Sequence, residues 1–365
     1  MRIAIVAPLV SVIREPHRGG SQAFVSDLAQ GLTKRGHDVH LYAASGSEVV
    51  GVQVIDTGVD HRALAATLYR SSGSGGAHGW PVADRAFASV FSAVAEGGYD
   101  LVHNHAFDAP AITLAGALGA PVVHTLHLPP DRAVADALRR TVGYASRPIV
   151  AAVSQSQANA WSEVVSVDAV LPPYVPTRAI PWGASSGKGA VFGGRLSPEK
   201  GAAEAIDIAQ AAGIGIEVYG DNYDDQYVEQ EVDTRRDKPG VAVHPGIPRT
   251  AFWEVMAGAA VVLCPAKWEE PFGMVAAEAQ ACGTPVVGYR RGALPEVIVE
   301  GVTGFLVAPD DVEAAAAAVA HTAELSRSRC RDHAEGRLDL ELSLDAHEGL
   351  YTKVASSGRR EPTGG

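Results

Sequence analysis

Short apolar runs alternate with segments of helical periodicity along this chain, and the alternation restarts half-way along it. Residues 2–7 are almost wholly apolar and lead, through a loop containing glycine, into a helical segment at 23–35. Runs that are apolar throughout are typical of parallel strands covered by helices on both faces. A stretch rich in Pro, Gly and Ser at 171–189 separates this series from a second one that begins at Ala190. The sequence therefore predicts two α/β domains, since 365 residues exceed what one core usually serves.

The predicted domains span residues 1–181 and 182–341, with a last helix at about 342–356 and a disordered tail at 357–365. Strands are expected at 2–7, 39–43, 52–55, 100–105, 121–127, 149–153, 216–220, 241–244 and 261–265, from 190 and 286 onward, and within 301–307. Longer helices are expected at 23–35, 85–96, 111–119, 157–164, 250–256 and 312–323. The Gly- and Ser-rich stretch 71–79 fits either a lid or slack surface.

Composition excludes several classes of protein. The formal net charge is −12, whereas nucleic-acid binders present a basic stripe. No run of about 18 apolar residues is present to span a membrane. Three cysteines, Cys264, Cys282 and Cys330, show no metal-like pairing. We therefore expect a cytoplasmic protein with reduced thiols, no nucleic-acid partner and no integral membrane contact.

Residues 269–288 are predicted to form a loop, a helix, a turn and a strand. Pro271 and Gly273 precede the helix, and Gly283 and Pro285 follow it, so the helix is expected at 274–281. Glu270 stands just before this helix, and Glu278 lies about two turns further on. The helix N-terminus between them suits a phosphate, so the two acids could hold one ligand. A helix that happens to carry one solvated glutamate is an equally good alternative.

A second stretch, 190–201, places two cations after a predicted strand. Ser197 and Pro198 suit the N-cap and the first position of a helix. Arg195 and Lys200 are then expected close together beside the helix N-terminus, where they would form an anion site. The alternative is a pair of solvated surface cations.

Histidines follow two neighbouring predicted strands of the first half. His103 and His105 come at the end of one strand, and His124 and His127 at the end of the next. Ligands gather beyond the C-terminal ends of strands in open parallel sheets, so these residues point at one crevice. A metal cluster is the rival interpretation, but no cysteine or acid completes it. Each histidine alone is more often a hydrogen-bonded structural residue.

Gly19 and Gly20 lie between the first strand and the first helix. A strand, a glycine loop and a helix N-terminus form a phosphate-binding geometry. A plain βαβ turn that needs glycine for its backbone is the alternative.

Together these motifs resemble the retaining glycosyltransferases of family four, which have the GT-B fold. The most specific segments are 270–273, Glu278, 283–287, Gly292, 295–296 and 301–307, followed by 192–201. The resemblance covers nearly the whole chain. It implies two Rossmann-like domains with parallel sheets facing across a cleft, and a C-terminal helix that crosses back to complete the first domain.

The resemblance also implies that the second half holds a nucleotide-diphosphate sugar. Glu278 would bind the ribose hydroxyls and Glu270 the hydroxyls of the donor sugar. Arg195 and Lys200 would hold the diphosphate and stabilise the leaving group. Backbone N–H groups would assist at Phe272, Gly273, Met274 and Val275.

The resemblance further implies that residues of the first half complete the reaction site. Gly20, beside Gly19, would approach the β-phosphate, and His127 would lie near the reacting carbon. His103, His105 and His124 are candidates for the acceptor side. This chain departs from the family pattern at Ser21-Gln22, which follow the glycine pair where an acid is common, and this leaves the acceptor open.

We therefore expect a retaining glycosyltransferase that moves a sugar, first of all from UDP, to a hydroxyl of a small molecule or glycan. Antibiotic biosynthesis and a general glycosylation step both fit. No cofactor or metal is expected, because two cations and a helix end can stabilise the departing diphosphate. A nucleotide-sugar 2-epimerase on the same fold and a non-catalytic nucleotide-sugar-binding protein are the alternatives. The missing three-glycine fingerprint disfavours a nicotinamide dehydrogenase.

Overall fold

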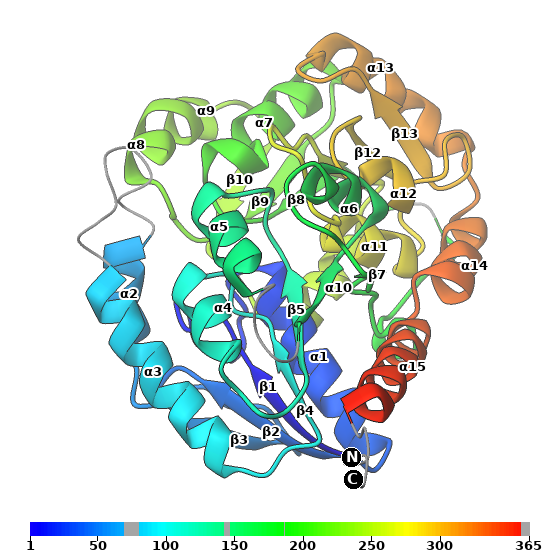
Figure 1. The fold of residues 1–365 in the computed structure, drawn as a ribbon. Helices are drawn as coiled ribbons and strands as arrows, with labels where there is room; N and C mark the ends of the chain where they lie inside the picture. The colour runs from blue at the N-terminus through cyan, green and yellow to red at the C-terminus, as the bar shows by residue number, and fades with distance from the viewer. Residues whose placement is uncertain (69–79, 142–146, 186, 359–365) are drawn as a thin grey trace, which may run out of the picture. The chain divides into compact units, whose positions relative to one another are not determined.

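The computed structural model describes residues 1–68, 80–141, 147–185 and 187–358, and the stretch 71–79 lies outside these ranges. The chain divides into two compact units (Figure 1). The first unit comprises Met1–Arg14, Ser21–Pro172 and the chain from Ser343 onward. The second unit comprises Glu15–Gly20 and Pro173–Leu342.

The chain passes from the first unit to the second after Pro172, whereas the sequence placed this boundary after residue 181. Residues 173–181 belong to the second unit because Arg331, on a helix of that unit, holds their backbone. The Arg331 guanidinium donates to the carbonyl oxygen of Thr177 at 2.8 Å and to that of Ile180 at 3.0 Å. Proline and glycine content alone does not predict these hydrogen bonds from a distant arginine.

A seven-stranded parallel sheet forms the centre of the first unit, in the order β3-β2-β1-β4-β5-β6-β7. Its strands are β1 (Arg2–Val6), β2 (Asp38–Ala43), β3 (Gln53–Asp56), β4 (Leu101–Asn104), β5 (Val122–Leu126), β6 (Ile149–Ala152) and β7 (Ala169–Val170). Strands β4 and β5 are buried at every position, as predicted for strands covered on both faces. In their register Asn104, the last residue of β4, lies beside His124, and β5 continues for two more residues to Leu126.

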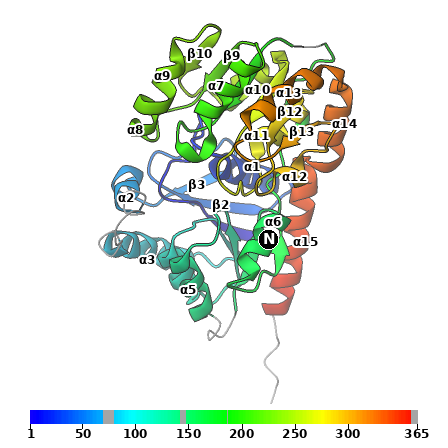
Figure 2. The same cartoon turned by 90° about the horizontal axis from the view of Figure 1, so that it is seen from above.

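Helices cover both faces of this sheet. They are α1 (Gly20–Lys34), α2 (His61–Leu68), α3 (Trp80–Glu96), α4 (Ala109–Ala115), α5 (Arg132–Thr141), α6 (Gln155–Ser162) and α15 (Leu340–Gly358). Figure 2 shows α1 and α3 on opposite sides of the strands. Helices α1 and α15 pack closely, since a Cβ added at Gly31 would lie 2.6 Å from Cδ1 of Leu344. The C-terminal helix therefore completes the core of the first unit. It runs to Gly358, two residues into the expected tail, and 359–365 lie outside the described residues.

The second unit contains a six-stranded parallel sheet in the order β10-β9-β8-β11-β12-β13. Its strands are β8 (Ala190–Gly193), β9 (Ile216–Tyr219), β10 (Val241–His244), β11 (Val261–Cys264), β12 (Val286–Tyr289) and β13 (Gly304–Val307). Its helices are α7 (Ala202–Ala211), α8 (Asp225–Tyr227), α9 (Asp233–Arg236), α10 (Arg249–Gly258), α11 (Met274–Ala281), α12 (Leu294–Val297), α13 (Val312–His321) and α14 (Arg327–Arg337). The predicted α/β class with two parallel sheets is confirmed.

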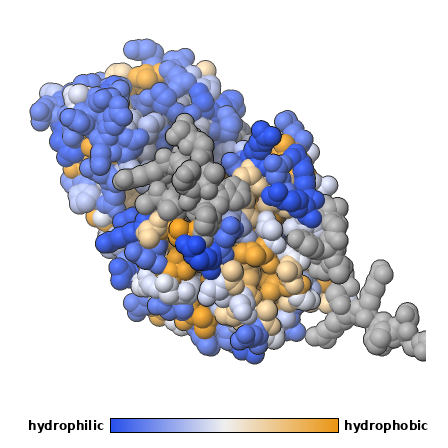
Figure 3. Space-filling model, turned by 60° about the vertical axis from the view of Figure 1, so that its left-hand side comes forward, coloured by the Kyte–Doolittle hydropathy of each residue, from blue (hydrophilic) through white to orange (hydrophobic). Residues whose placement is uncertain are grey.

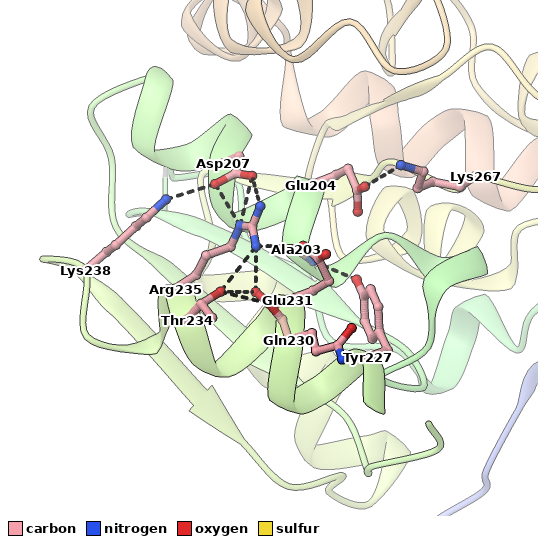
Figure 4. A network of polar contacts seen from close by, with 10 residues as sticks. All are labelled: Ala203, Glu204, Asp207, Tyr227, Gln230, Glu231, Thr234, Arg235, Lys238 and Lys267. Atoms are coloured by element: carbon pink, nitrogen blue, oxygen red, sulfur yellow. Dashed lines mark hydrogen bonds and ion pairs between the residues drawn. The ribbon is translucent and has the colours of Figure 1, made fainter. Parts of the chain in front are cut away.

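A polar network holds α7 against the segment that contains α9 (Figure 4). Arg235 contacts the carboxylate of Asp207 at 2.9 Å and that of Glu231 at 3.0 Å. Lys238 reaches the same Asp207 at 3.0 Å. This end of α7 is therefore fixed by charge-assisted bonds rather than by apolar packing alone.

The surface view in Figure 3 is mostly hydrophilic, with apolar side chains gathered in the lower part of that face. Within the described part of the chain, no helix is long and apolar enough to cross a membrane.

Candidate functional site

Lys200 and Glu270 meet in the second unit although 70 positions separate them in the sequence. The Lys200 ammonium donates to Oε2 of Glu270 at 2.8 Å and lies 4.8 Å from the ring centre of Trp268. The Trp268 indole N–H donates to the same oxygen at 2.8 Å. Two donors therefore fix the Glu270 carboxylate, whose side chain is 14% exposed.

Backbone bonds join the loops that carry these two side chains. The amide of Lys267 donates to the carbonyl oxygen of Glu199 at 2.9 Å, and its ammonium reaches Glu204 at 2.6 Å (Figure 4). The amide of Ala293 donates to the carbonyl oxygen of Glu270 at 2.8 Å. The sheet therefore sets the separation of Lys200 and Glu270 through short loops held at several points.

Arg195 follows β8 and makes two contacts of its own. Its guanidinium bonds Glu199 at 3.0 Å and lies 4.7 Å from the ring centre of Tyr223. Burial by itself raises the pKa of Glu199, but hydrogen bonds and the charge of Arg195 lower that pKa below its usual value. Arg195 and Lys200 thus each have a carboxylate partner in this structure.

The turn that carries Lys200 differs from the sequence prediction. Pro198–Lys200 is a separate 3₁₀ turn, and α7 begins only at Ala202. Gly201 breaks the helix with a φ of 75°, in the left-handed region. A Cβ there would lie 2.2 Å from a backbone carbonyl oxygen, so the close approach also requires glycine. The expected continuous helix from Pro198 is therefore wrong.

The N-terminus of α7 is also less available to a ligand than expected. The amide of Ala203 donates to the hydroxyl of Tyr227 at 3.0 Å (Figure 4). One of the N–H groups that a helix start leaves unpaired is therefore used within the protein.

The helix α11 begins at Met274, as the sequence predicts, and no side chain caps it. Gly273 precedes it with a φ of 96°, and a Cβ there would lie 2.7 Å from Cδ2 of Leu294. A helix start without a side-chain cap leaves N–H groups and a positive dipole for an anion. Glu270 stands directly before this helix start.

Glu278, on α11, forms an ion pair with Arg249 at the start of α10. The two side chains are only 6% and 10% exposed, respectively. The Arg249 guanidinium also lies 5.0 Å from the ring centre of Trp253. The sequence predicts Glu278 as a ligand-binding carboxylate and does not predict this partner.

The segment Glu15–Gly20 belongs to the same unit. The Glu15 carboxylate accepts the amide N–H of Arg249 at 3.1 Å and contacts His17 at 3.0 Å. Burial opposes ionisation of Glu15, but these two partners lower its pKa on balance. Gly20 is the first residue of α1, and a Cβ added there would lie 2.9 Å from Sδ of Met274. Gly20 thus contacts the helix start that follows Glu270, with Gly19 directly before it.

The four histidines predicted at strand ends are all buried in the first unit, and two of them are hydrogen-bonded to each other. His105 Nδ1 lies 2.9 Å from Nε2 of His127. His103 bonds the hydroxyls of Tyr351 at 2.5 Å and Thr125 at 2.7 Å, so both its ring nitrogens have protein partners. The exposed fractions of the residues are 0% for His103 and His105, 1% for His124 and 7% for His127. Of the four, His127 reaches the surface most.

Burial keeps these imidazoles neutral. It lowers the pKa of His124 and His127 to about 4, and that of His103 and His105 well below the ordinary value. Asp108 lies just beyond β4, and burial raises its pKa to about 7. Among the described residues, no group of three or more His, Cys, Asp or Glu is arranged to hold a metal ion.

Two protein-family models match the chain, one to each half. The model described as glycosyltransferase family 4 matches residues 18–178. The model described as glycosyl transferases group 1 matches residues 184–337. The chain belongs to glycosyltransferase family 4.

Curated relatives of this glycosyltransferase include two D-inositol 3-phosphate glycosyltransferases. The protein from Acidothermus cellulolyticus is 28% identical over 84% of this chain and 79% of its own length. The protein from Mycolicibacterium smegmatis is 28% identical over 85% of this chain and 81% of its own length.

Solved structures share the fold of this glycosyltransferase. Sucrose-phosphate synthase from Thermosynechococcus elongatus has a TM-score of 0.79 at 18% identity and covers 98% of this chain and all of its own. HepE from Anabaena, solved with UDP-glucose, has a TM-score of 0.72 at 18% identity and covers 98% of this chain and 100% of its own. AviGT4, from avilamycin A biosynthesis, has a TM-score of 0.71 at 22% identity and covers 97% of this chain and 98% of its own. The two parallel-sheet units thus form the GT-B fold.

In this glycosyltransferase the predicted donor residues lie within the second unit. Lys200, Glu270 and the start of α11 lie around one point, with Phe272 packed on the ring of Tyr174 at 5.8 Å between centres. The roles assigned to these residues stay predictions, and they concern Gly19, Gly20, Arg195, Lys200, Glu270, Glu278, Phe272, Gly273, Met274, Val275 and the four histidines.

Sequence reasoning missed residues that contact the predicted ones. Arg249 and Trp268 bond the two acids, and Tyr351 on α15 bonds His103. Trp268 stands two positions before Glu270, a local signal that could have been used. Arg249 and Tyr351 are distant in the sequence from their partners, so no spacing rule finds them.

Proposed function

We propose that this glycosyltransferase moves a sugar from UDP to a hydroxyl of a small-molecule or glycan acceptor, with retention of configuration, without a metal, and in the cytoplasm. The observation that carries the proposal is the fixed pair of Lys200 and Glu270 beside the uncapped start of α11. A cation, a carboxylate and free amide groups at one point suit a phosphate joined to a sugar.

Each group has a part in holding the donor. Lys200 and Arg195 would leave their carboxylate partners in part to face the diphosphate, whose negative charge grows as it departs. Glu270, held by Trp268, would accept hydroxyl groups of the sugar. Glu278 would accept the ribose hydroxyls from within α11.

The reaction exchanges one bond for another at the anomeric carbon. The bond from that carbon to the oxygen of the β-phosphate breaks, and the electron pair stays on the diphosphate. The acceptor oxygen bonds to the same face, and its proton passes to the departing phosphate oxygen. The chain's task is to position the donor and stabilise the leaving charge, with His127 beside the reacting carbon.

The comparisons support the choice of donor and of first acceptors. HepE, a neighbour of the same fold, was solved with UDP and with UDP-glucose. The curated relatives act on D-inositol 3-phosphate, so a phosphorylated cyclitol is the first acceptor class to examine. AviGT4 suggests antibiotic-type acceptors as the second class.

The test is a transfer assay with a panel of UDP- and GDP-sugars against cyclitol phosphates and polyol natural products. We expect UDP release that depends on acceptor, and a product whose anomeric proton coupling matches that of the donor. Turnover should persist in a metal chelator. Inversion at the anomeric carbon would overturn the retaining mechanism. Loss of turnover in chelator would overturn metal independence, and a preference for GDP-sugars would overturn the choice of UDP as donor. Release of only an isomerised donor would favour the epimerase.

A further inference from the structure

His105 and His127 form a buried, hydrogen-bonded pair in the first unit. Their Nδ1 and Nε2 atoms lie 2.9 Å apart, a normal hydrogen-bond distance. They follow β4 and β5, which pair in the sheet of the first unit. Because the bond joins two neutral imidazoles, one ring must donate and the other accept.

The surroundings of His105 decide which ring donates. Nε2 of His105 is buried and has no hydrogen-bond partner in the structure. A proton on that nitrogen would be a buried donor without an acceptor, which folded proteins rarely contain. With its proton on Nδ1 instead, His105 donates to His127 and leaves only an unshared lone pair buried. The neutral His127 then carries its own proton on Nδ1.

The ring of His105 is held in place by its neighbours. It lies 4.0 Å between centres from the ring of His103, tilted by 39°. His103 is fixed in turn by the hydroxyls of Thr125 and Tyr351. The C-terminal helix α15 thus contributes, through Tyr351, to the orientation of His105.

We propose that His105 is a positioning residue, which donates its Nδ1 proton to Nε2 of His127 and so makes His127 present a protonated Nδ1 to the substrate. The proposal rests on the proposed function, which places His127 beside the reacting carbon. His127 is the more exposed partner of the pair, at 7% against 0% for His105. A fixed Nδ1–H is a hydrogen-bond donor suited to a hydroxyl or oxyanion of a bound sugar nucleotide.

Three substitutions at one position separate this role from a packing role. His105→Asn keeps an amide N–H near the place of Nδ1. His105→Gln puts the amide near the place of Nε2, and His105→Phe keeps a ring without a donor. We expect H105N to retain kcat within a few-fold of the wild-type value. H105Q and H105F should lower kcat by about ten-fold or more, as losses of partners that fix a histidine tautomer do, with little change in the donor KM.

A measurement on the free protein tests the tautomer without any activity. The protein is labelled with ¹⁵N-histidine, and the His127 signals are assigned by comparison with His127→Asn. In the wild type and in H105N, Nδ1 of His127 should carry the proton, whereas in H105F the tautomer should change or become mixed. Thermal unfolding of each variant checks that it is folded.

The outcomes are distinguishable from failure of the proposed function. A proton on Nε2 of wild-type His127, or the same tautomer in H105F as in the wild type, overturns the positioning role. Equal loss of kcat in H105N and H105F overturns it as well. Absence of sugar transfer by the wild type overturns the proposed function alone, because the ¹⁵N spectra still report which nitrogen is protonated.

Discussion

Glu278 and Arg249 form an ion pair in which both side chains are almost completely buried, at 6% and 10% exposure. The carboxylate that family likeness assigns to the ribose is therefore engaged by a cation of the protein itself. The pair also joins α11 to α10, whose first amide is held by Glu15. A donor that reaches Glu278 must share it with Arg249 or displace it.

The first prediction concerns removal of one partner of this pair. Glu278→Gln should lower the free energy of unfolding by about 3–5 kcal/mol, because it removes the negative charge that pairs with a buried guanidinium. The double variant Glu278→Gln with Arg249→Met should recover most of that loss, since no buried charge remains. Urea unfolding of the four proteins in the cycle measures the coupling. A loss in the double variant equal to the sum of the two single losses would show that the pair contributes nothing.

The same pair has a consequence for nucleotide recognition. If Glu278 binds the ribose, the wild type should bind UDP more tightly than 2′-deoxy-UDP, by about 1.5 kcal/mol or more. Arg249→Met frees the carboxylate from its fixed rotamer and should reduce this preference. Calorimetry with both nucleotides checks it, and equal affinity of the wild type for the two would remove the ribose role from Glu278.

The second prediction concerns the two cations. Arg195→Met together with Lys200→Met should lower turnover by about 10³-fold or more, because the leaving diphosphate loses its nearest positive charges. Lys238→Met is the matched control. Lys238 also pairs with a carboxylate, that of Asp207, but this pair belongs to the network that joins α7 to the segment containing α9 (Figure 4). Its loss should leave kcat unchanged. Wild-type turnover in the double variant would contradict the diphosphate assignment.

The fold could be predicted further than the site. Apolar runs located β1, β4, β5 and β8, and the glycines located the start of α11 at Met274. Helix α14 is not among the predicted helices, and its Arg327 and Arg331 are buried and bond backbone carbonyl groups. A sequence pattern treats arginines as surface residues. These two can be buried only because carbonyl oxygens from remote segments accept their N–H groups.

The sequence predicts single candidate residues of the site, but it does not predict the partners that those residues contact. Glu270, Glu278, Arg195 and Lys200 all lie in the second unit. Their partners Trp268, Arg249 and Glu199 hold the side chains in place, and only the folded chain brings most of them together. The helix predicted from Pro198 was wrong because the local pattern of Ser, Pro and Lys satisfies start rules that Gly201 then breaks.

The third prediction uses Gly201 and a matched glycine. Gly201 and Gly301 both have left-handed backbones, with φ of 75° and 68°. A Cβ at Gly201 would lie 2.2 Å from the carbonyl oxygen of Pro265, whereas nothing lies within 4 Å at Gly301. Gly301→Ala should cost about 1–2 kcal/mol of stability from backbone strain alone. Gly201→Ala should cost more and also lower kcat, because the turn that carries Lys200 must move. Equal effects of both changes on unfolding and turnover would contradict the close approach.

The fourth prediction concerns stability in acid. Burial lowers the folded-state pKa of five histidines in the first unit: His103, His105, His124, His127 and His347. Below pH 6.5 the unfolded chain therefore binds more protons than the folded chain, so stability must fall as pH falls from 6.5 toward 4. Asp108 acts in the opposite sense, because its folded pKa is raised to about 7 and the folded chain holds the extra proton between pH 4 and 7. One carboxyl offsets only part of the effect of five imidazoles, so the net loss in acid remains.

Two variants separate these contributions. In His347→Asn the amide can replace the Nδ1 bond to the carbonyl oxygen of Ser343, at 2.7 Å in the wild type, while one titrating group is lost. Its unfolding midpoint in urea should therefore fall less steeply than that of the wild type between pH 6.5 and 4. Asp108→Asn removes the cost of ionising a buried carboxyl, so its gain over the wild type should grow as pH rises from 4 to 7 and then stay constant. If its gain is the same at pH 4.5 and pH 8, Asp108 ionises in the folded protein as readily as in the unfolded chain.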